Sequence, residues 1–217
     1  SAAALQLSDG ASLKEIVPVN AALDVARVKG VNAVTTRDIG AALSVSTRPI
    51  FTYFNSMDEV RAEMRRSAET LYRKYIAEGL TAEIPFLGVG MKYIAFAREE
   101  PALYRLLFLS PDENGQSGAM AALKTAQTLT RESIQRIYRM DEKTADHYFR
   151  DMWLVVHSLA ALIVSGAQTY TDAEISATLT EFSLSLCKAF KEIPGFEDGT
   201  FDRDGEFRAL VQKDAPQ

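Results

Sequence analysis

The sequence predicts an all-α chain in two parts, a small N-terminal unit of three helices and a larger C-terminal helical bundle. Apolar residues recur at three- and four-residue steps along most of the 217 residues, which is the period of an amphipathic helix. No segment alternates polar and apolar residues as a half-buried strand would. Proline and glycine signals, clearest at Glu83–Pro85 and between Ser110 and Gly118, divide the chain into helical segments.

The first predicted helix starts at the Ser12-x-x-Glu15 capping pair and ends at Lys29, where Gly30 can act as a C-terminal cap. A local break is expected near Pro18, early enough in the helix for the missing amide proton to be tolerated. The apolar face of this helix consists of Ile16, Val19, Ala22, Leu23 and Ala26.

Two short helices separated by a tight turn are predicted next. Thr35 and Asp38 form a capping box for the first, and Ser46 caps the second, which covers Thr47 to Tyr53 with Pro49 in its first turn. The spacing places inward the side chains of Ile39, Ala42, Leu43, Ile50, Phe51 and Phe54. It leaves outward those of Thr47, Arg48, Thr52 and Tyr53. This is the layout of a helix-turn-helix that reads DNA.

The same stretch resembles the N-terminal DNA-binding domain of the tetracycline-repressor (TetR) family over about residues 14 to 62. The matching residues are Gly30, Thr35-Thr36-Arg37-Asp38-Ile39, Val45-Ser46, Phe51-Thr52-Tyr53-Phe54 and Ser56. Two positions differ from the family pattern, since Ser44 replaces a usual Gly in the turn and Met57 replaces a frequent Lys. A left-handed backbone at Ser44 would cost roughly 1 kcal/mol more than at Gly. Both differences support an alternative, a helical interaction module that has lost sequence-specific DNA binding.

The layout and the resemblance together imply which residues contact DNA. Arg48 is the best candidate for reading a guanine edge. Contacts with phosphates or base edges are expected from Thr36, Arg37, Ser46, Thr47, Thr52, Tyr53 and Ser56. Residues 1–75 hold 10 Lys and Arg against 8 Asp and Glu, whereas the remainder holds 14 against 21. The asymmetry has the sign expected of a DNA-binding head on an acidic body.

We predict a helix-turn-helix domain at residues 12–56, an effector-binding and dimerisation domain at 57–193 and a tail at 194–217. Ser56 and Glu59 form a capping box for a connecting helix over 57–79. The later helices are expected at Phe86–Arg98, Ala102–Leu109, Met120–Arg139, from Asp141 to before Gly166, and from the Thr171-x-x-Glu174 cap onward. The tail should contain at most one short helix, Glu206–Gln212.

The segment from Met152 to Val164, MWLVVHSLAALIV, is apolar on almost every helical face. Such a helix must be covered on all sides, by its own domain and by a partner. The last long helix has near-heptad spacing in Ile175, Leu179, Phe182, Leu186, Ala189 and Ile193. Two consecutive helices of this kind predict a four-helix contact between two copies, hence a homodimer. Burial within one subunit alone is the alternative.

A group of large side chains in the C-terminal part forms either ordinary core or an apolar cavity for a small-molecule effector. Its members are Tyr93, Phe96, Tyr104, Phe108, Met120, Tyr148, Met152, Trp153 and His157. The region is also similar to a TetR-family C-terminal subgroup through Ala97-x-Glu99-x-Pro101-x-Leu103-Tyr104 and Trp153-x-x-x-His157-Ser158, where Ser158 replaces a Gly. This resemblance implies the fold and leaves the effector class open.

Signatures of catalysis are missing from the sequence. The two histidines lie ten residues apart, and there is no HExxH, paired cysteine, phosphate-binding glycine loop or nucleophile elbow. We therefore expect no enzyme, no catalytic residue, no metal site and no cofactor. The single Cys187 suits a reducing cytoplasm. No apolar run approaches the roughly 20 residues that span a bilayer, and the N-terminus lacks the pattern of a secretion signal.

The sequence thus predicts a cytoplasmic transcriptional regulator without a membrane partner. The resemblance implies a repressor that binds a palindromic operator in double-stranded DNA as a dimer and is released by a small molecule.

Overall fold

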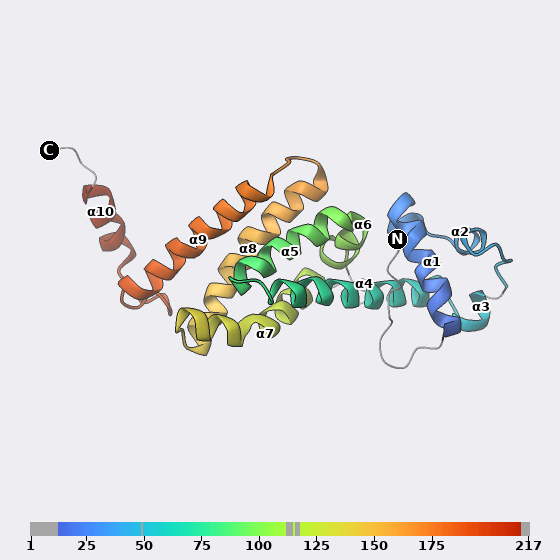
Figure 1. The fold of residues 1–217 in the computed structure, drawn as a ribbon, viewed down its shortest axis with the longest axis horizontal. Helices are drawn as coiled ribbons and strands as arrows, with labels where there is room; N and C mark the ends of the chain where they lie inside the picture. Colours follow the sequence, from blue (N-terminus) through green and yellow to red (C-terminus); the bar gives the residue numbers. More distant parts are fainter. Residues whose placement is uncertain (1–12, 49, 112–114, 116–117, 214–217) are drawn as a thin grey trace.

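The computed structural model describes residues 13–48, 50–111, 115 and 118–213, and this part of the chain is helical without an extended strand (Figure 1). The elements in order are α1 (Leu13–Lys29), the 3₁₀ turn η1 (Val31–Ala33), α2 (Thr36–Ala42), α3 (Ile50–Tyr53), α4 (Met57–Gly79), α5 (Pro85–Glu99), α6 (Pro101–Tyr104), the π-helical turn η2 (Arg105–Leu109), α7 (Gly118–Tyr138), α8 (Glu142–Ser165), α9 (Asp172–Glu192) and α10 (Arg203–Lys213). The predicted all-α class is confirmed.

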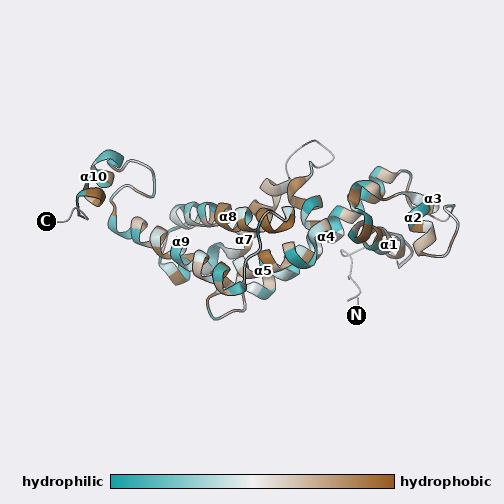
Figure 2. Cartoon of the chain, turned by 90° about the horizontal axis from the view of Figure 1, so that it is seen from above, coloured by the Kyte–Doolittle hydropathy of each residue, from teal (hydrophilic) through white to brown (hydrophobic). Residues whose placement is uncertain are grey.

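The molecule is elongated, with the short helices at one end and α10 at the other (Figures 1 and 2). Helices α1, α2 and α3 form a head, and α4 extends from it into a bundle that contains α5, α7, α8 and α9. The division predicted at residues 56 and 57 coincides with the start of α4. The tail boundary predicted at residue 194 follows the end of α9. The domain limits themselves stay predictions.

The head is held together by a small apolar core. Val19, Ala22, Leu23 and Ala26 of α1 are almost completely buried, and they contribute to one cluster with Ile39, Ile50 and Phe54. The break predicted near Pro18 does not occur, since α1 continues through it. The ring of Pro18 is buried in the head, so contacts with the core offset the one missing helical hydrogen bond. Ser12 and the side chain of Ile16 lie outside the described residues.

Helix α4 connects the core of the head to the core of the bundle. Its buried residues recur on one face from Val60 and Met64 near the head to Tyr72 and Ile76 in the bundle. Helical spacing in the sequence predicts that Tyr75 belongs to this apolar face, but Tyr75 is only half-buried, while Tyr72 is fully buried. Since all the buried side chains belong to one continuous cluster, the head and the bundle share a hydrophobic core.

The end of α4 and the start of α5 approach one another at two glycines. A Cβ atom on Gly88 would lie 2.2 Å from the carbonyl oxygen of Gly79, and one on Gly79 would lie 2.6 Å from the Cα of Val89. Neither distance is possible for real atoms, so only glycine permits this contact between the two backbones. The contact fixes where α5 lies against α4.

An ion pair ties the head directly to the bundle. Arg27 of α1 donates from Nε to Glu100 Oε2 at 2.8 Å and from a terminal nitrogen to Glu100 Oε1 at 3.0 Å. The second terminal nitrogen donates to Asp24 at 2.7 Å. The hydrogen bonds with Glu100 are the main reason why the pKa of Arg27 is raised. Two parallel bonds of this kind hold α1 in a defined orientation at the start of α6.

The segment after α9 packs against α8 and α9 through aromatic side chains. Phe196 lies against Phe190 and Phe201, with ring centroids 5.1 and 5.0 Å apart, and it stacks on His147 of α8. His147 Nδ1 lies 3.1 Å from the carbonyl oxygen of Glu197. Helix α10 also covers Arg203 to Lys213 and is longer than the predicted helix. Aromatic side chains in a mainly polar stretch explain the difference.

Helix α8 is the one helix, within the described part of the chain, that is long and apolar enough to cross a membrane. Its mean hydropathy reaches 1.2 over an 18-residue window, and 44% of that window is buried in the fold. The central helix of a helical bundle meets the same test. It begins at the Asp141 cap and ends at Gly166, as predicted.

Candidate functional site

The outward face of the head is positioned first by α2. Thr35 Oγ1 accepts a hydrogen bond from the Asp38 amide at 3.2 Å, and the Asp38 carboxylate accepts from the Thr35 amide at 3.2 Å. Lys29 Nζ lies 2.6 Å from the same carboxylate. The bonds from Lys29 and then Thr35 lower the pKa of Asp38 to about 2. The predicted capping box is thus confirmed, and it places Thr36 and Arg37 in the first turn of α2.

The turn after α2 has the predicted left-handed residue. Ser44 has φ of 56°, and the following amide, that of Val45, donates to the carbonyl of Gly40 at 2.9 Å. Gly40 is needed there, because a Cβ atom on it would lie 2.9 Å from the Val45 carbonyl oxygen. The turn therefore forms with serine at a cost of roughly 1 kcal/mol relative to glycine.

Helix α3 is shorter than predicted and begins later. The described helix runs from Ile50 to Tyr53, and the Ile50 amide donates to the Thr47 carbonyl at 3.2 Å. The Ser46 cap stays a prediction. Pro49 lies outside the described residues. In this single turn Ile50 points into the core, while the next side chain along, that of Phe51, is 54% exposed. The predicted inward position of Phe51 is wrong, because adjacent helical residues point about 100° apart.

The other predictions about which side chains the head exposes are only partly confirmed. Six of the proposed DNA contacts are exposed, namely Arg37, Ser46, Thr47, Arg48, Thr52 and Ser56. Thr36 is half-buried, and Tyr53, predicted to point outward, packs partly against the core. Ala42, predicted to point inward, is exposed. Among the described residues, no hydrogen bond or ion pair holds the guanidinium of Arg37 or Arg48. Both are free to meet a phosphate or a base edge.

The start of α4 lies beside this face. Ser56 accepts from the Glu59 amide at 3.2 Å, as predicted. Glu59 does not return the bond to Ser56, because its carboxylate accepts from the backbone amide of Asn55 at 2.6 Å and from its side chain at 3.1 Å. Only half of the predicted capping box is present. Met57, where the family pattern has Lys, packs partly against the apolar core.

A second candidate site is a group of buried aromatic rings in the bundle. Phe108 lies against Tyr93 and Tyr104, with ring centroids 5.3 and 4.7 Å apart. Trp153 stacks on His157 at 4.6 Å with the planes 8° apart. Tyr72 of α4, which the sequence did not single out for this site, joins the group through Tyr93 at 5.9 Å and Phe108 at 5.2 Å. Phe96 packs against Tyr72, and the predicted Met152 is also buried.

His157 is the polar centre of this aromatic group. Its Nδ1 lies 2.9 Å from the Tyr93 hydroxyl and 3.0 Å from the Tyr104 hydroxyl. Burial lowers the pKa of His157, so the ring is neutral near neutral pH and Nδ1 accepts from one hydroxyl at a time. Burial raises the pKa of Tyr104 to about 12 and that of Tyr93 as well. The two segments that resemble the TetR C-terminal subgroup therefore meet in space, through Tyr104 and His157.

Two polar atoms beside the group have no partner. The Tyr72 hydroxyl oxygen and Trp153 Nε1 are buried and make no hydrogen bond within the described structure. Both residues border a void of about 10 Å³ between α4, α5, α7 and α8. That space is about one water molecule in size. The group is thus a filled core with two unpaired donors rather than an open cavity.

Two members of the predicted ligand set lie outside this group. Met120 is 61% exposed on α7 and does not reach the aromatic rings, because it stands in the first turn after the loop. Tyr148 is buried in an adjoining cluster with Phe86 and Tyr138, with centroids 5.1 and 5.0 Å away. Its hydroxyl lies 2.7 Å from Ser183 Oγ.

The outer face of α8 and α9 exposes apolar side chains. Leu154 and Leu162 are 54% and 40% exposed, with Ser158 between them at the same four-residue spacing. Phe182 of α9 is 48% exposed. Ile175 and Leu179, the first members of the near-heptad set, are instead buried against the chain's own bundle. In the described residues no group of three or more His, Cys, Asp or Glu could hold a metal ion.

Two matched substitutions test the arrangement in the aromatic group. Tyr72→Phe removes an unpaired buried hydroxyl and should leave the melting temperature unchanged or raise it. Tyr93→Phe removes a hydroxyl that bonds His157 and should cost about 1 kcal/mol, or about 2–4 °C in melting temperature for a chain of this size. Thermal unfolding followed by circular dichroism measures both. An equal fall in melting temperature in the two variants would contradict this arrangement of the aromatic group.

Comparisons with known proteins agree with the geometry of the head and the bundle. Residues 19–64 match the family described as bacterial regulatory proteins, tetR family. Residues 86–183 match the family described as tetracyclin repressor-like, C-terminal domain. The chain is also similar to an uncharacterized HTH-type transcriptional regulator, YobS of Bacillus subtilis (strain 168), with 24% identity over 164 residues that cover 74% of this chain and 84% of that protein. The chain therefore belongs to the TetR family of DNA-binding transcriptional regulators.

Proposed function

We propose that the protein is a repressor that binds a palindromic operator as a homodimer and leaves it when a small molecule enters the aromatic group. The proposal rests on one observation, the continuity of α4. This helix starts at Ser56 beside the outward face of the head, and its buried Tyr72 belongs to the aromatic group. A change in the bundle can therefore alter the position of the head.

Operator reading is assigned to the exposed side chains around α3. The guanidinium of Arg48 can form two parallel bonds with a guanine edge in the major groove. Arg37 and the hydroxyls of Thr47, Thr52 and Ser56 are assigned to phosphates or nearby base edges. Family membership favours this function over an interaction module without DNA binding. The half-buried Met57 supplies apolar contact in place of a phosphate contact.

Dimerisation is assigned to the outer face of α8 and α9. Leu154, Leu162 and Phe182 are large apolar side chains that one subunit leaves uncovered. A second copy related by a two-fold axis would cover them with the same surface and complete a four-helix contact. The two heads would then face half-sites that are separated by roughly one or more turns of DNA.

Release is assigned to a shift between two arrangements of α4. A ligand that supplies hydrogen-bond acceptors to the Tyr72 hydroxyl and Trp153 Nε1 would be favoured, because neither donor has an acceptor on the protein among the described residues. Since the void holds about one water, the ligand needs an arrangement in which the rings move apart. The ligand stabilises that arrangement and lowers the population able to bind DNA.

Arg48→Ala tests the DNA face. Selection of bound sequences from random DNA should first yield an inverted repeat for the natural protein. On that sequence Arg48→Ala should weaken binding by about 1–3 kcal/mol and relax the preference at one position in each half-site. Arg136→Ala, an exposed arginine on α7, is the matched control. Unchanged affinity of Arg48→Ala, or a binding constant that is insensitive to salt, would contradict the assignment.

Phe182→Glu tests the dimer face. A charge there would be buried without a partner in the dimer, so the variant should sediment as a monomer in analytical ultracentrifugation and bind the inverted repeat more weakly. Met120→Glu introduces the same charge at another exposed apolar residue and should remain a dimer. If Phe182→Glu is still dimeric, the contact between subunits lies elsewhere.

Titration of the operator complex with candidate effectors tests release. A compound that enters the aromatic group should displace labelled operator and raise the melting temperature of the free protein. Tyr72→Phe should respond more weakly to it, whereas Tyr148→Phe in the adjoining cluster should respond like the natural protein. A compound whose binding depends on Tyr72 but leaves operator affinity unchanged would count against release by this route.

A further inference from the structure

Helix α5 is apolar on two opposite faces. One face contributes Phe86, Tyr93 and Phe96 to the core of the bundle. On the other face, Leu87, Met91 and Ala95 recur every four residues and are only half-buried. A helix on the surface of a bundle normally has polar residues at such positions. Leu87 and Met91 pack partly against the core, and the proposed function makes no use of the surface that they leave exposed.

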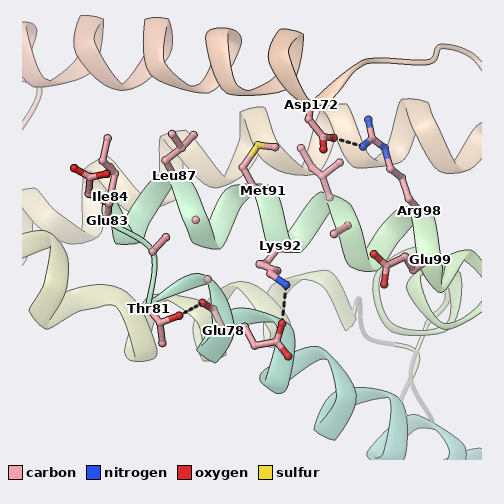
Figure 3. A pocket seen from close by; sticks show the side chains of 15 residues that line it. Glu78, Thr81, Glu83, Ile84, Leu87, Met91, Lys92, Arg98, Glu99 and Asp172 are labelled. Atoms are coloured by element: carbon pink, nitrogen blue, oxygen red, sulfur yellow. Dashed lines mark hydrogen bonds and ion pairs between the residues drawn. The ribbon is translucent and has the colours of Figure 1, made fainter. Parts of the chain in front are cut away.

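The second stripe forms the floor of a groove of about 690 Å³ (Figure 3). Its walls are the end of α4, the loop between α4 and α5, and Asp172 at the start of α9. The close contact of Gly79 with Gly88 fixes the wall at the α4 end. The volume falls within the range of about 300–1,000 Å³ that is typical of small-molecule sites. Met91 and Tyr93 point about 200° apart around the helix, so the groove and the aromatic group lie on different sides of α5.

Acidic groups outnumber basic groups around the groove. Its charged residues are four carboxylates and two cations, namely Glu78, Glu83, Glu99, Asp172, Lys92 and Arg98. Both cations are already engaged, as the dashed lines in Figure 3 indicate. Lys92 Nζ lies 2.7 Å from Glu78 and 6.0 Å above the ring of Tyr75, and Arg98 binds the Asp172 carboxylate and the Tyr170 carbonyl.

Two carboxylates are left without a cation. Glu99 accepts only the hydroxyl of Tyr75, at 2.5 Å, and Glu83 has no ion pair among the residues that the structure describes. The groove therefore combines an apolar floor with an uncompensated charge of −2. An anion would be repelled, and a neutral apolar molecule would leave the carboxylates unused. The complementary molecule is apolar and positively charged.

We propose that this groove binds a small organic cation with an apolar body. The body lies on Leu87, Met91 and Ala95, where the polarizable thioether of Met91 suits contact with flat or irregular groups. Glu83 and Glu99 stand at the two ends of α5 (Figure 3), so the positive charge faces Glu83, at the end where α4 and its loop form the wall. Because Glu78 and Gly79 at the end of α4 form one wall, the bound cation contacts the helix that leads to the head. The proposed cation site is separate from the aromatic group. It does not depend on whether the aromatic group binds an effector.

Tetraphenylphosphonium and tetraphenylborate provide matched probes, because they share size and shape and differ in the sign of their charge. Calorimetric titration of the full chain, at low salt and without DNA, should show one phosphonium ion bound per chain. The phosphonium should bind at least about tenfold more tightly than the borate, since two unpaired carboxylates favour the cation.

Three variants locate the site. Glu83→Gln should weaken phosphonium binding about two- to fivefold, while Glu132→Gln on the exposed side of α7 removes the same charge and should have no effect. Ala95→Trp places a large ring in the open groove and should abolish binding, with an unchanged melting temperature to show that the fold is intact.

Several outcomes would overturn the proposal. Equal binding of the two ions would show that the charge is irrelevant, and phosphonium binding that persists in Ala95→Trp would place the site elsewhere. Loss of binding in Tyr72→Phe would place it in the aromatic group. If neither ion binds and Met91→Glu lowers the mass of the particle in solution, the groove is a contact between subunits.

Discussion

The burial of one side of α4 along its whole length is the constraint on which the rest of the structure depends. Val60 and Met64 belong to the core near the head, Tyr72 and Ile76 to the core of the bundle, and the cluster between them is continuous. A helix of 23 residues is about 35 Å long and bends little. Movement at either end of α4 must therefore be accommodated at the other end.

The polar atoms in the aromatic group have opposite effects on its stability. His157 Nδ1 lies within hydrogen-bond distance of two tyrosine hydroxyls and accepts from one at a time, and its ring stacks on Trp153. These contacts hold the rings in a defined arrangement. The Tyr72 hydroxyl and Trp153 Nε1 lower the stability of the folded protein, since a buried donor without a partner costs about 1–3 kcal/mol. Within the described residues neither donor finds an acceptor on the protein.

Local sequence signals predicted the helices and their caps well. They predicted the exposure of individual side chains poorly. The Thr35–Asp38 cap and the glycine after α8 depend on neighbouring residues, so the sequence alone sufficed. The left-handed backbone at Ser44 was expected from the family resemblance. The orientation of Phe51 depends on how this one-turn helix packs against α1, which is a tertiary contact. For the DNA face, the sequence correctly predicted that most of the proposed DNA-contacting side chains are exposed. Their contacts with DNA stay predictions.

The candidate sites in the bundle show a second limit. Tyr72 joins the aromatic group because α4 and α5 meet at two glycines nine residues apart, and nothing in helical periodicity reveals that contact. Met120 was grouped with the aromatic residues by its apolar character, although the start of α7 turns it to solvent. Apolar residues at helical spacing show which face of a helix is apolar. They do not show which other element packs against that face, because this depends on the tertiary structure.

The ion pair between Arg27 and Glu100 has a consequence for how such regulators can be recombined. The two residues come from the head and from the bundle, 73 positions apart, yet each completes the other's hydrogen bonding. If the head were transferred to another family member, Arg27 would face whatever residue that protein has at the position of Glu100. Exchange of heads between relatives should therefore succeed more often when the residue before the proline of α6 is transferred with them.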